Sequence, residues 1–167
     1  MRTISGATLK RLGLWLVAPL LVLILATLVS AKELDLSKAV KVGNGKIMVV
    51  EFTDPDCPFC KKAEAYFQKR SDVTRYVFFI PLKSHPESKG KVQYILSAKD
   101  KEKVYQEVAT GSFDKWKLSE ITPEGIALQQ AHEQIAKDLG LNATPIFIIN
   151  GSIVRGFDLK RLEPLLK

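Results

Sequence analysis

Hydrophobic residues gather in short runs that predict strands. Residues 40–42 and 46–52 flank Gly43-Asn44-Gly45, a sequence typical of a hairpin turn, so they are expected to pair with each other. Residues 76–82 and residues 145–149 are also apolar, and each run predicts a buried strand. These runs predict the sheet of a folded domain.

Helical periodicity fills the chain between these strands. Residues 61–70 are amphipathic, and Pro58 suits the first turn of that helix because the missing N–H has no helical partner there. Ala63, Tyr66 and Phe67 are its expected inward residues. After a polar break at residues 83–89, two further helical runs are expected, whose apolar positions are Val92, Ile95 and Leu96, and then Val104, Tyr105 and Val108.

The second half of the chain contains one long predicted helix. Residues 113–121 are irregular, and Trp116 is expected to pack on the core. Thr122-Pro123-Glu124 then supplies a cap, a proline and an acid in the order that starts a helix, and Gly140 ends it. Its apolar positions follow at spacings of three and four, which predicts an inward face of Leu128, Ala131, Ile135 and Leu139.

The order of these elements indicates an α/β fold. Asn150-Gly151 predicts a second hairpin to residues 152–156, and a final helix is expected over residues 159–167. A β-α-β unit gives a parallel core, to which hairpins add antiparallel strands. The layout is thioredoxin-like, with helices inserted after the second core strand. Residues 32–45 are expected to form a lead-in linker and hairpin strand, and residues 46–167 the thioredoxin-like domain.

The first 31 residues have the pattern of an export signal. Arg2, Lys10 and Arg11 precede an uncharged stretch, residues 12–31, that ends in the small residues Val29-Ser30-Ala31. Cleavage after Ala31 would release an exported protein. Retention would leave a helix long enough to anchor the domain in the inner membrane. Both alternatives place residues 32–167 outside the cytoplasm, in the periplasm, where disulfides form.

Charge changes this picture little. The whole chain carries a formal charge of +7, and residues 32–167 carry 22 basic and 18 acidic residues, a net +4. The basic residues are interleaved with acids and form no arginine patch with aromatic neighbours. Nucleic-acid binding is therefore not expected.

The only two cysteines lie three positions apart, in Cys57-Pro58-Phe59-Cys60. They follow a buried strand and begin a helix, where unpaired N–H groups and the helix dipole stabilise a thiolate. A structural bridge would close a very short loop and gain little entropy, and structural zinc needs four ligands. Redox use is therefore favoured, with Cys57 as the attacking thiol and Cys60 as the resolving thiol, and with no metal or cofactor.

Thr144-Pro145 is the second candidate for the site. A proline directly before a strand suits a cis peptide in a tight turn, which would turn the Thr144 backbone toward Cys57 and offer strand-like pairing to a substrate. An ordinary trans turn is the alternative. Pro58 and Phe59 are expected to face the substrate as well, because they add bulk beside the sulfurs.

Glu51 lies within an apolar strand, six residues before Cys57. If Glu51 points into the interface between sheet and helix, burial raises its pKa, and it can exchange protons with Cys60. The alternative is a solvated carboxylate at a strand edge. The two histidines, His85 and His132, are expected at the surface.

Several of these motifs together resemble the DsbC/DsbG family of periplasmic disulfide isomerases and reductases. The resemblance covers residues 46–167 and rests on four segments, which are Phe52-Thr53-Asp54-Pro55-Asp56-Cys57-Pro58-Phe59-Cys60-Lys61, Ser97-Ala98-Lys99-Asp100-Lys101, Ala143-Thr144-Pro145, and Asn150-Gly151 with Gly156. The resemblance implies a thioredoxin fold with Cys57 as attacking thiol and Thr144-Pro145 as the cis-proline loop. It also implies a membrane reductase of the DsbD type as partner.

The chain departs from that family in two ways. Few residues separate Ala31 from the catalytic strand, so the family's dimerisation domain is not expected, and a monomer is. Ser97 stands where the family carries a structural cysteine. The leading hypothesis is an exported oxidoreductase that reduces or isomerises disulfides in exported proteins. Alternatives are a dithiol oxidase, a reductase dedicated to cytochrome c maturation, and, in another class, a non-catalytic binding module.

Overall fold

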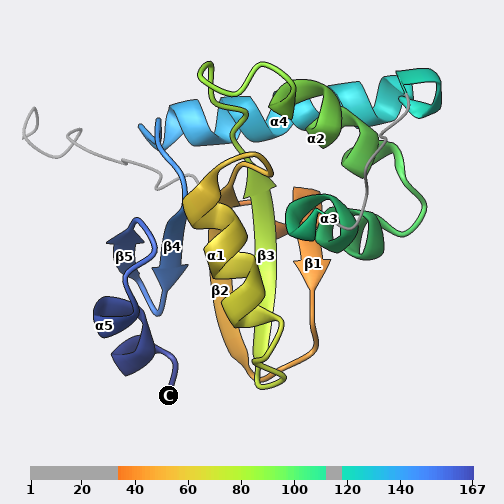
Figure 1. Ribbon diagram of the computed structural model, residues 1–167. Coiled ribbons are helices and arrows are strands. Elements are labelled where there is room, and N and C mark those ends of the chain that lie inside the picture. Colours follow the sequence, from red (N-terminus) through yellow and green to blue (C-terminus); the bar gives the residue numbers. More distant parts are fainter. Residues whose placement is uncertain (1–33, 112–117) are drawn as a thin grey trace, which may run out of the picture. The chain divides into compact units, whose positions relative to one another are not determined.

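The computed structural model describes residues 34–111 and 118–167, which form a five-stranded sheet, the helices around it and the loops that connect them (Figure 1). The strands lie in the order β1-β3-β2-β4-β5. Their bounds are Val40–Val42 for β1, Ile47–Thr53 for β2, Val73–Phe79 for β3, Ile146–Ile149 for β4 and Ser152–Arg155 for β5. Only β2 and β3 run parallel, and the remaining neighbours are antiparallel. The sheet therefore has the mixed layout expected from the sequence.

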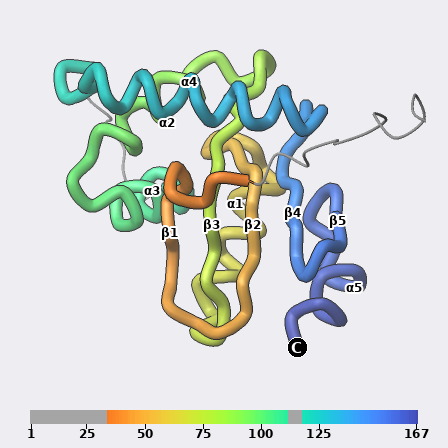
Figure 2. The backbone as a smooth tube through the Cα atoms, turned by 180° about the vertical axis from the view of Figure 1, so that it is seen from behind, coloured from red at the N-terminus to blue at the C-terminus, as the bar shows by residue number. Residues whose placement is uncertain are grey.

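Helices cover both faces of the sheet. The α-helices are α1 (Pro58–Phe67), α2 (Ser88–Ser97), α3 (Lys101–Thr110), α4 (Pro123–Asp138) and α5 (Leu159–Leu162), with 3-10 turns at Leu36–Lys38, Leu118–Glu120 and Glu163–Leu165. Figure 1 shows α1 in front of β2 and β3, and Figure 2, seen from the opposite side, shows α4 running across one end of the strands. Ala136 of α4 packs with Val50, Phe52 and Phe78, on the face opposite α1. The helical insertion, α2 and α3, follows β3 as predicted.

The predicted hairpin between the first two strands is wrong. β1 pairs with β3, and β3 lies between β1 and β2. The connecting loop passes across the start of β3, where Gly45 donates a backbone hydrogen bond to the Val73 carbonyl. A Cβ atom at Gly45 would lie 1.9 Å from the Asp72 carbonyl carbon. The glycines that suggested a tight turn are needed instead for this close passage of two backbones.

The second core strand begins three residues earlier than predicted. β3 starts at Val73 and ends at Phe79, so it includes the polar residues Thr74 and Arg75, both of which are buried. The apolar pattern predicts a strand over residues 76–82, because polar residues such as Thr74 and Arg75 ordinarily lie outside a buried strand. The position of Arg75 matters for the site described below.

The long helix α4 is confirmed, but its inward face is rotated from the predicted one. Thr122 caps it through its side chain, which accepts a hydrogen bond from the Gly125 N–H. Its buried residues are Gly125, Gln129, His132 and Ala136. Of the predicted inward residues, Leu128 and Ile135 are partly buried against the core, whereas Leu139 is 44% exposed. Gly125 lies so close to α2 that a Cβ there would meet the Ser97 hydroxyl at 2.0 Å. Because the two helices pack this closely at Gly125, the face of α4 that contains Gln129 and His132 is buried.

The apolar stretch at residues 12–31 and Trp116 both lie outside the described residues. Within residues 34–111 and 118–167, no helix has the length and apolar character that a membrane span requires.

Candidate active site

Cys57 stands at the junction of the sheet and α1. It is the N-cap residue of that helix, with an extended backbone, and its carbonyl accepts a hydrogen bond from the Lys61 N–H at 3.0 Å. The thiol is only 5% exposed, and it donates a hydrogen bond to the Thr144 carbonyl oxygen across 3.7 Å. An N-cap sulfur faces the unpaired N–H groups of the first helical turn, which favour negative charge. The position therefore suits a sulfur that reacts as a thiolate.

Cys60 lies one turn further along α1 and is 2% exposed. Both cysteines are free thiols. Burial raises the pKa of Cys60 well above its ordinary value, and the polar groups of the Thr144 and Thr53 side chains and of the Asp54 backbone oppose that rise. A buried thiol of this kind stays protonated until a group nearby removes its proton.

The peptide bond between Thr144 and Pro145 is cis, as predicted. Pro145 is buried directly before β4, and its carbonyl accepts a hydrogen bond from the Gly156 N–H at 2.8 Å. The Thr144 carbonyl faces the Cys57 thiol, so residues 87 positions apart in the chain meet here. The sequence prediction that these two motifs lie together is confirmed.

Glu51 is completely buried on β2, as the first of its two interpretations predicted. Its Oε2 accepts a hydrogen bond from Arg75 Nη1 at 2.9 Å. Burial raises the pKa of Glu51, and the positive charge of Arg75 opposes that rise without cancelling it. The carboxylate therefore takes up a proton more readily than one in solvent. Its exchange of protons with Cys60 remains a prediction.

Sequence reasoning missed the two other charged residues of this cluster. Arg75 Nη1 also donates to Glu64 Oε2 at 2.7 Å, and the side chain of Arg75 is 3% exposed and that of Glu64 is fully buried. One cation therefore serves two carboxylates under the inner face of α1. Glu64 follows the predicted inward residue Ala63 directly, but a glutamate on an amphipathic helix ordinarily faces solvent, so no signal distinguished it.

Asp54 is a second residue that the sequence did not single out. It is completely buried in the loop before Cys57. Its Oδ1 accepts hydrogen bonds from the Asp56 N–H and the Ser88 hydroxyl, both at 2.8 Å. Its Oδ2 accepts from the Leu82 N–H at 2.7 Å and lies 3.0 Å from His85 Nδ1. One carboxylate thus ties the loop of the cysteines to the segment after β3.

The backbone of Asp54 completes this anchor. Its carbonyl accepts a hydrogen bond from the Cys57 N–H at 3.1 Å, so the nucleophile candidate is tied directly to the buried aspartate. Asp56, the next acid along, pairs with Lys91 Nζ at 2.7 Å. The loop conformation therefore depends on side chains from α2, which the insertion supplies.

Neither histidine lies at the surface as predicted. His85 is 21% exposed in its side chain and rests against Asp54. His132 is completely buried, and its Nδ1 accepts a hydrogen bond from the Phe79 N–H at 3.1 Å. Its Nε2 lies 2.7 Å from the Lys38 carbonyl and donates to it. Burial lowers the pKa of His132 to about 4. The histidine is a structural link between β3, α4 and the lead-in segment.

Pro58 and Phe59 lie on the outer side of the first turn of α1, where both are exposed. The Phe59 ring is 57% exposed, and Lys62 Nζ lies 5.5 Å from the centre of the ring. The first turn thus presents an apolar surface with a positive charge in the same helical turn as the two cysteines, and its contact with a substrate stays a prediction.

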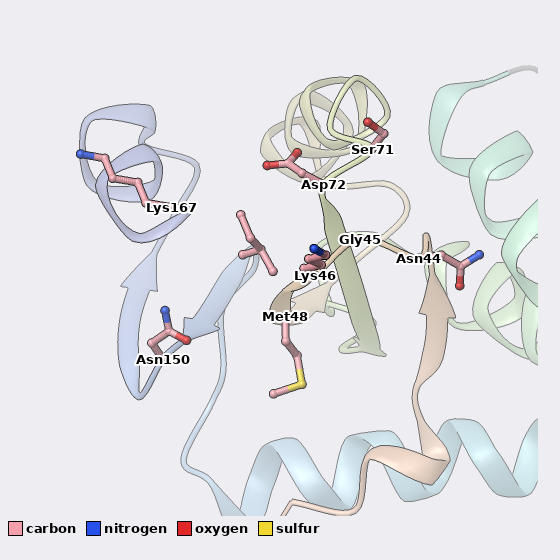
Figure 3. Close-up of a pocket in the computed structure, with 9 residues that line it drawn as sticks. Asn44, Gly45, Lys46, Met48, Ser71, Asp72, Asn150 and Lys167 are labelled. Atoms are coloured by element: carbon pink, nitrogen blue, oxygen red, sulfur yellow. The ribbon is translucent and has the colours of Figure 1, made fainter.

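An open depression of about 780 Å³ lies at the far end of β2 from the cysteines (Figure 3). It is lined by the starts of β2 and β3 and by the turn after β4, including Lys46, Met48, Asp72, Asn150 and Lys167. It holds neither a thiol nor a buried titratable group. In the described part of the chain, no group of three or more metal-ligating side chains comes together either. The cysteine region is therefore the candidate site.

Comparison with characterised proteins supports this choice. A family model for a thioredoxin-like domain matches residues 34–158. A probable thiol:disulfide interchange protein DsbC of Bordetella parapertussis is 31% identical over 130 residues, which cover 74% of this chain and 43% of that protein. The similarly named protein of Bordetella avium is 40% identical over 78 residues, which cover 46% of this chain and 28% of that protein. The chain spans less than half the length of these curated relatives.

Solved structures give the same result. A disulfide interchange protein from Neisseria gonorrhoeae is 33% identical, with a TM-score of 0.68, and the match covers 80% of this chain and 96% of that one. The thiol-disulfide exchange protein α-DsbA2 from Wolbachia pipientis is 19% identical, with a TM-score of 0.60 over 77% of this chain and 85% of that one, and shows a shared fold alone. Together with the cis-proline loop beside a Cys-x-x-Cys helix, these matches show that the chain belongs to the thioredoxin-like family.

Proposed function

We propose that this protein is an exported thiol–disulfide oxidoreductase that reduces or isomerises disulfides in other exported proteins. The observation that carries the proposal is the pairing of Cys57, at the N-terminus of α1, with the Thr144 carbonyl on the cis-proline loop. In this arrangement a client strand can pair with the loop backbone while its disulfide reaches the Cys57 sulfur.

The reaction begins with attack by the Cys57 thiolate on a client disulfide, which forms a mixed disulfide and releases one client thiolate. Cys60 then attacks Cys57, the bond between Cys57 and the client breaks, and the second client thiolate leaves. Alternatively, a client thiolate attacks the mixed disulfide, and the client is isomerised with the dithiol regenerated. The burial of Cys60 supports a resolving role, because a thiol that remains protonated does not compete for the first attack.

Export is part of the proposal and rests on the sequence of residues 1–31. The basic start, the apolar run and the small residues before Ala31 support delivery to the periplasm, either as a free protein or tethered to the inner membrane by residues 12–31. A reductant is needed to keep the dithiol active for reduction or isomerisation. A membrane reductase of the DsbD type, as the resemblance to the DsbC/DsbG group implies, would supply the electrons.

Insulin reduction by dithiothreitol tests the proposal, because the released chains precipitate and the turbidity reports the rate. The wild-type protein is expected to shorten the lag. The Cys57→Ser variant should abolish the acceleration, while Cys60→Ser should retain a fraction of it. A Cys57→Ser protein as active as the wild type would exclude the enzyme and leave the thioredoxin-like scaffold as a binding module.

The same dithiol can also serve as an oxidase, and the redox potential separates the two directions. A value near that of thioredoxin, about −270 mV, would support reduction, and one near about −120 mV would support oxidation. The redox state of the two cysteines in cells, measured by alkylation after acid quenching, gives the physiological direction. We expect a reduced dithiol.

A further inference from the structure

Two polar side chains of β2 lie on the face of the sheet that α1 covers. Glu51 and Thr53 are two positions apart on the strand, so their side chains lie on the same face of the sheet. Glu51 is also bound to Glu64 of α1 through Arg75, which identifies this face as the one that α1 covers. Both Glu51 and Thr53 are completely buried.

One oxygen of each residue has no hydrogen-bond partner within the described residues. These atoms are Glu51 Oε1 and Thr53 Oγ1. The other carboxylate oxygen of Glu51 is bound to Arg75, and the Thr53 backbone is fixed by a hydrogen bond from the Ile80 N–H at 2.8 Å. A buried hydroxyl without a partner costs free energy, so its retention in a well-packed strand calls for a role in another state of the protein.

The Thr53 hydroxyl affects the ionisation of both Cys60 and Glu51. Its hydroxyl lowers the pKa of Cys60 and also that of Glu51, in each case against the effect of burial. In the dithiol state neither neighbour completes a hydrogen bond with it. The hydroxyl therefore lies, buried and without a partner among the described residues, on the α1-covered face of β2 next to a carboxylate that can accept a proton, and under the helix whose Cys60 thiol must lose one.

We propose that Thr53 relays a proton between Cys60 Sγ and Glu51 Oε1 during disulfide exchange. The inference rests on the proposed function and extends it to the step in which Cys60 acts. A threonine hydroxyl can accept one hydrogen bond while donating another, and this is the chemical requirement for a relay.

In the resolving step, the Thr53 hydroxyl gives its proton to the Glu51 carboxylate and takes the proton of the Cys60 thiol. Glu51 becomes a neutral acid, and Cys60 becomes a thiolate. The thiolate attacks the Cys57 sulfur of the mixed disulfide, so that the Cys57–Cys60 bond forms and the client leaves as a thiolate. The client is reduced and the protein dithiol is oxidised, and no further reactant is required. Reduction of the protein reverses these steps.

The charged and titratable groups around Glu51 suit this exchange. Arg75 comes from β3, Glu64 and Cys60 from α1, and Tyr105 from α3. With both glutamates ionised, the cluster of Glu51, Glu64 and Arg75 carries a net negative charge in the interior, and one proton makes it neutral. Because Arg75 holds Oε2 of Glu51, the proton is directed to Oε1, the oxygen that faces no cation.

The test follows the lifetime of a mixed disulfide with glutathione. The reduced protein is mixed with oxidised glutathione, quenched in acid at intervals and analysed by mass spectrometry, between about pH 5 and pH 9. The adduct on Cys57 reports the first attack, and its decay reports the attack by Cys60. Thr53→Val removes the hydroxyl at nearly constant shape, and Thr53→Ser keeps it.

We expect the adduct to form at the same rate in all variants and to decay at least about tenfold more slowly in Thr53→Val near neutral pH. Thr53→Ser should decay at nearly the wild-type rate. In the Glu51→Gln background, Thr53→Val should not slow the decay of the mixed disulfide any further, because both substitutions interrupt the same proton relay. Should Thr53→Val fail to fold, Thr53→Ala supports the same comparison.

Thr74→Val is the matched control, because Thr74 is also a buried strand threonine, but its hydroxyl donates to the Gly45 carbonyl far from the thiols. It should leave both rates unchanged. Decay in Thr53→Val at the wild-type rate, or additive effects of Thr53→Val and Glu51→Gln, would overturn the relay. No adduct in the wild type would overturn the proposed function itself, which is a different result.

Discussion

The Cys57 thiol donates a hydrogen bond to the Thr144 carbonyl, so the first turn of α1 and the cis-proline loop form a single surface. Neither segment reaches this arrangement alone. α1 is held by Ala63 and Phe67 against β2 and β4, and the loop is held by β4 beside β2. Antiparallel pairing of β2 with β4 therefore brings the two halves of the site together.

Arg75 should be among the residues most important for stability. Arg75→Met leaves the carboxylates of Glu51 and Glu64 buried without their cation, which is expected to cost about 3–5 kcal/mol in the free energy of unfolding. Urea unfolding near neutral pH measures this loss. Lys89→Met is the control, since Lys89 pairs with Glu133 on the exposed surface and should cost less than about 1 kcal/mol. Equal losses in the free energy of unfolding would show that the buried pairs of Arg75 matter no more for stability than a surface ion pair.

The raised pKa of Glu51 predicts that it destabilises the fold as the pH rises. The unfolded chain loses this proton near the ordinary value of 4.5, while the folded protein keeps it to higher pH. Over that interval the folded state binds more protons, so the stability falls with increasing pH. The stability of Glu51→Gln relative to the wild type should therefore increase as the pH rises above 4.5. Urea titrations at several pH values test this, and a difference that does not change with pH would contradict it.

His132 should act in the opposite direction. Burial lowers its pKa from 6.5 to about 4, so the unfolded state takes up a proton first as the pH falls. The stability that depends on the neutral ring is complete above 6.5 and is lost toward 4, by about 3 kcal/mol. His132→Gln should remove this part of the pH dependence. In nitrogen NMR spectra the wild-type ring should keep its proton on Nε2 near neutral pH, and a ring that titrates near 6.5 would contradict the prediction.

Asp54 should control the geometry of Cys57 without touching a client. Asp54→Asn turns one acceptor oxygen into a donor, which faces the Leu82 N–H or the Ser88 hydroxyl, and should cost at least about 2 kcal/mol. Because the Cys57 N–H is bound to the same residue, insulin reduction should slow as well. Asp56→Asn, which weakens only a partly exposed pair with Lys91, should change both much less. Similar effects of the two substitutions would argue against the anchor.

The sequence predicted the fold well where apolar periodicity and turn chemistry agree. The Thr122 cap and the second hairpin are both confirmed, because each depends on local geometry. The pairing of β1 with β3 was not predictable in this way. Gly43-Asn44-Gly45 has a hairpin composition, and only the tertiary passage across β3 shows why the glycines are required.

The residues of the candidate site also differ in how far the sequence predicts them. Cys57, Cys60 and Thr144-Pro145 belong to sequence motifs, and the structure brings them together. Glu64, Arg75 and His132 are polar residues that ordinarily face solvent, and their burial depends on partners from other elements. The sequence around Asp54 indicates only a turn. Its role as an anchor was not predictable, because three of its four hydrogen-bonding partners come from residues 82–88, far along the chain.

The reactivity of the two single-cysteine variants tests the central claim most directly. The chain contains only these two cysteines, so Cys60→Ser leaves Cys57 as the sole thiol, and Cys57→Ser leaves Cys60. With oxidised glutathione near neutral pH, Cys60→Ser is expected to form the mixed disulfide at least about a hundredfold faster, because the helix N-terminus favours a thiolate there, whereas burial keeps Cys60 protonated. Equal rates, or a faster reaction of Cys60, would contradict the assignment of Cys57 as the attacking thiol.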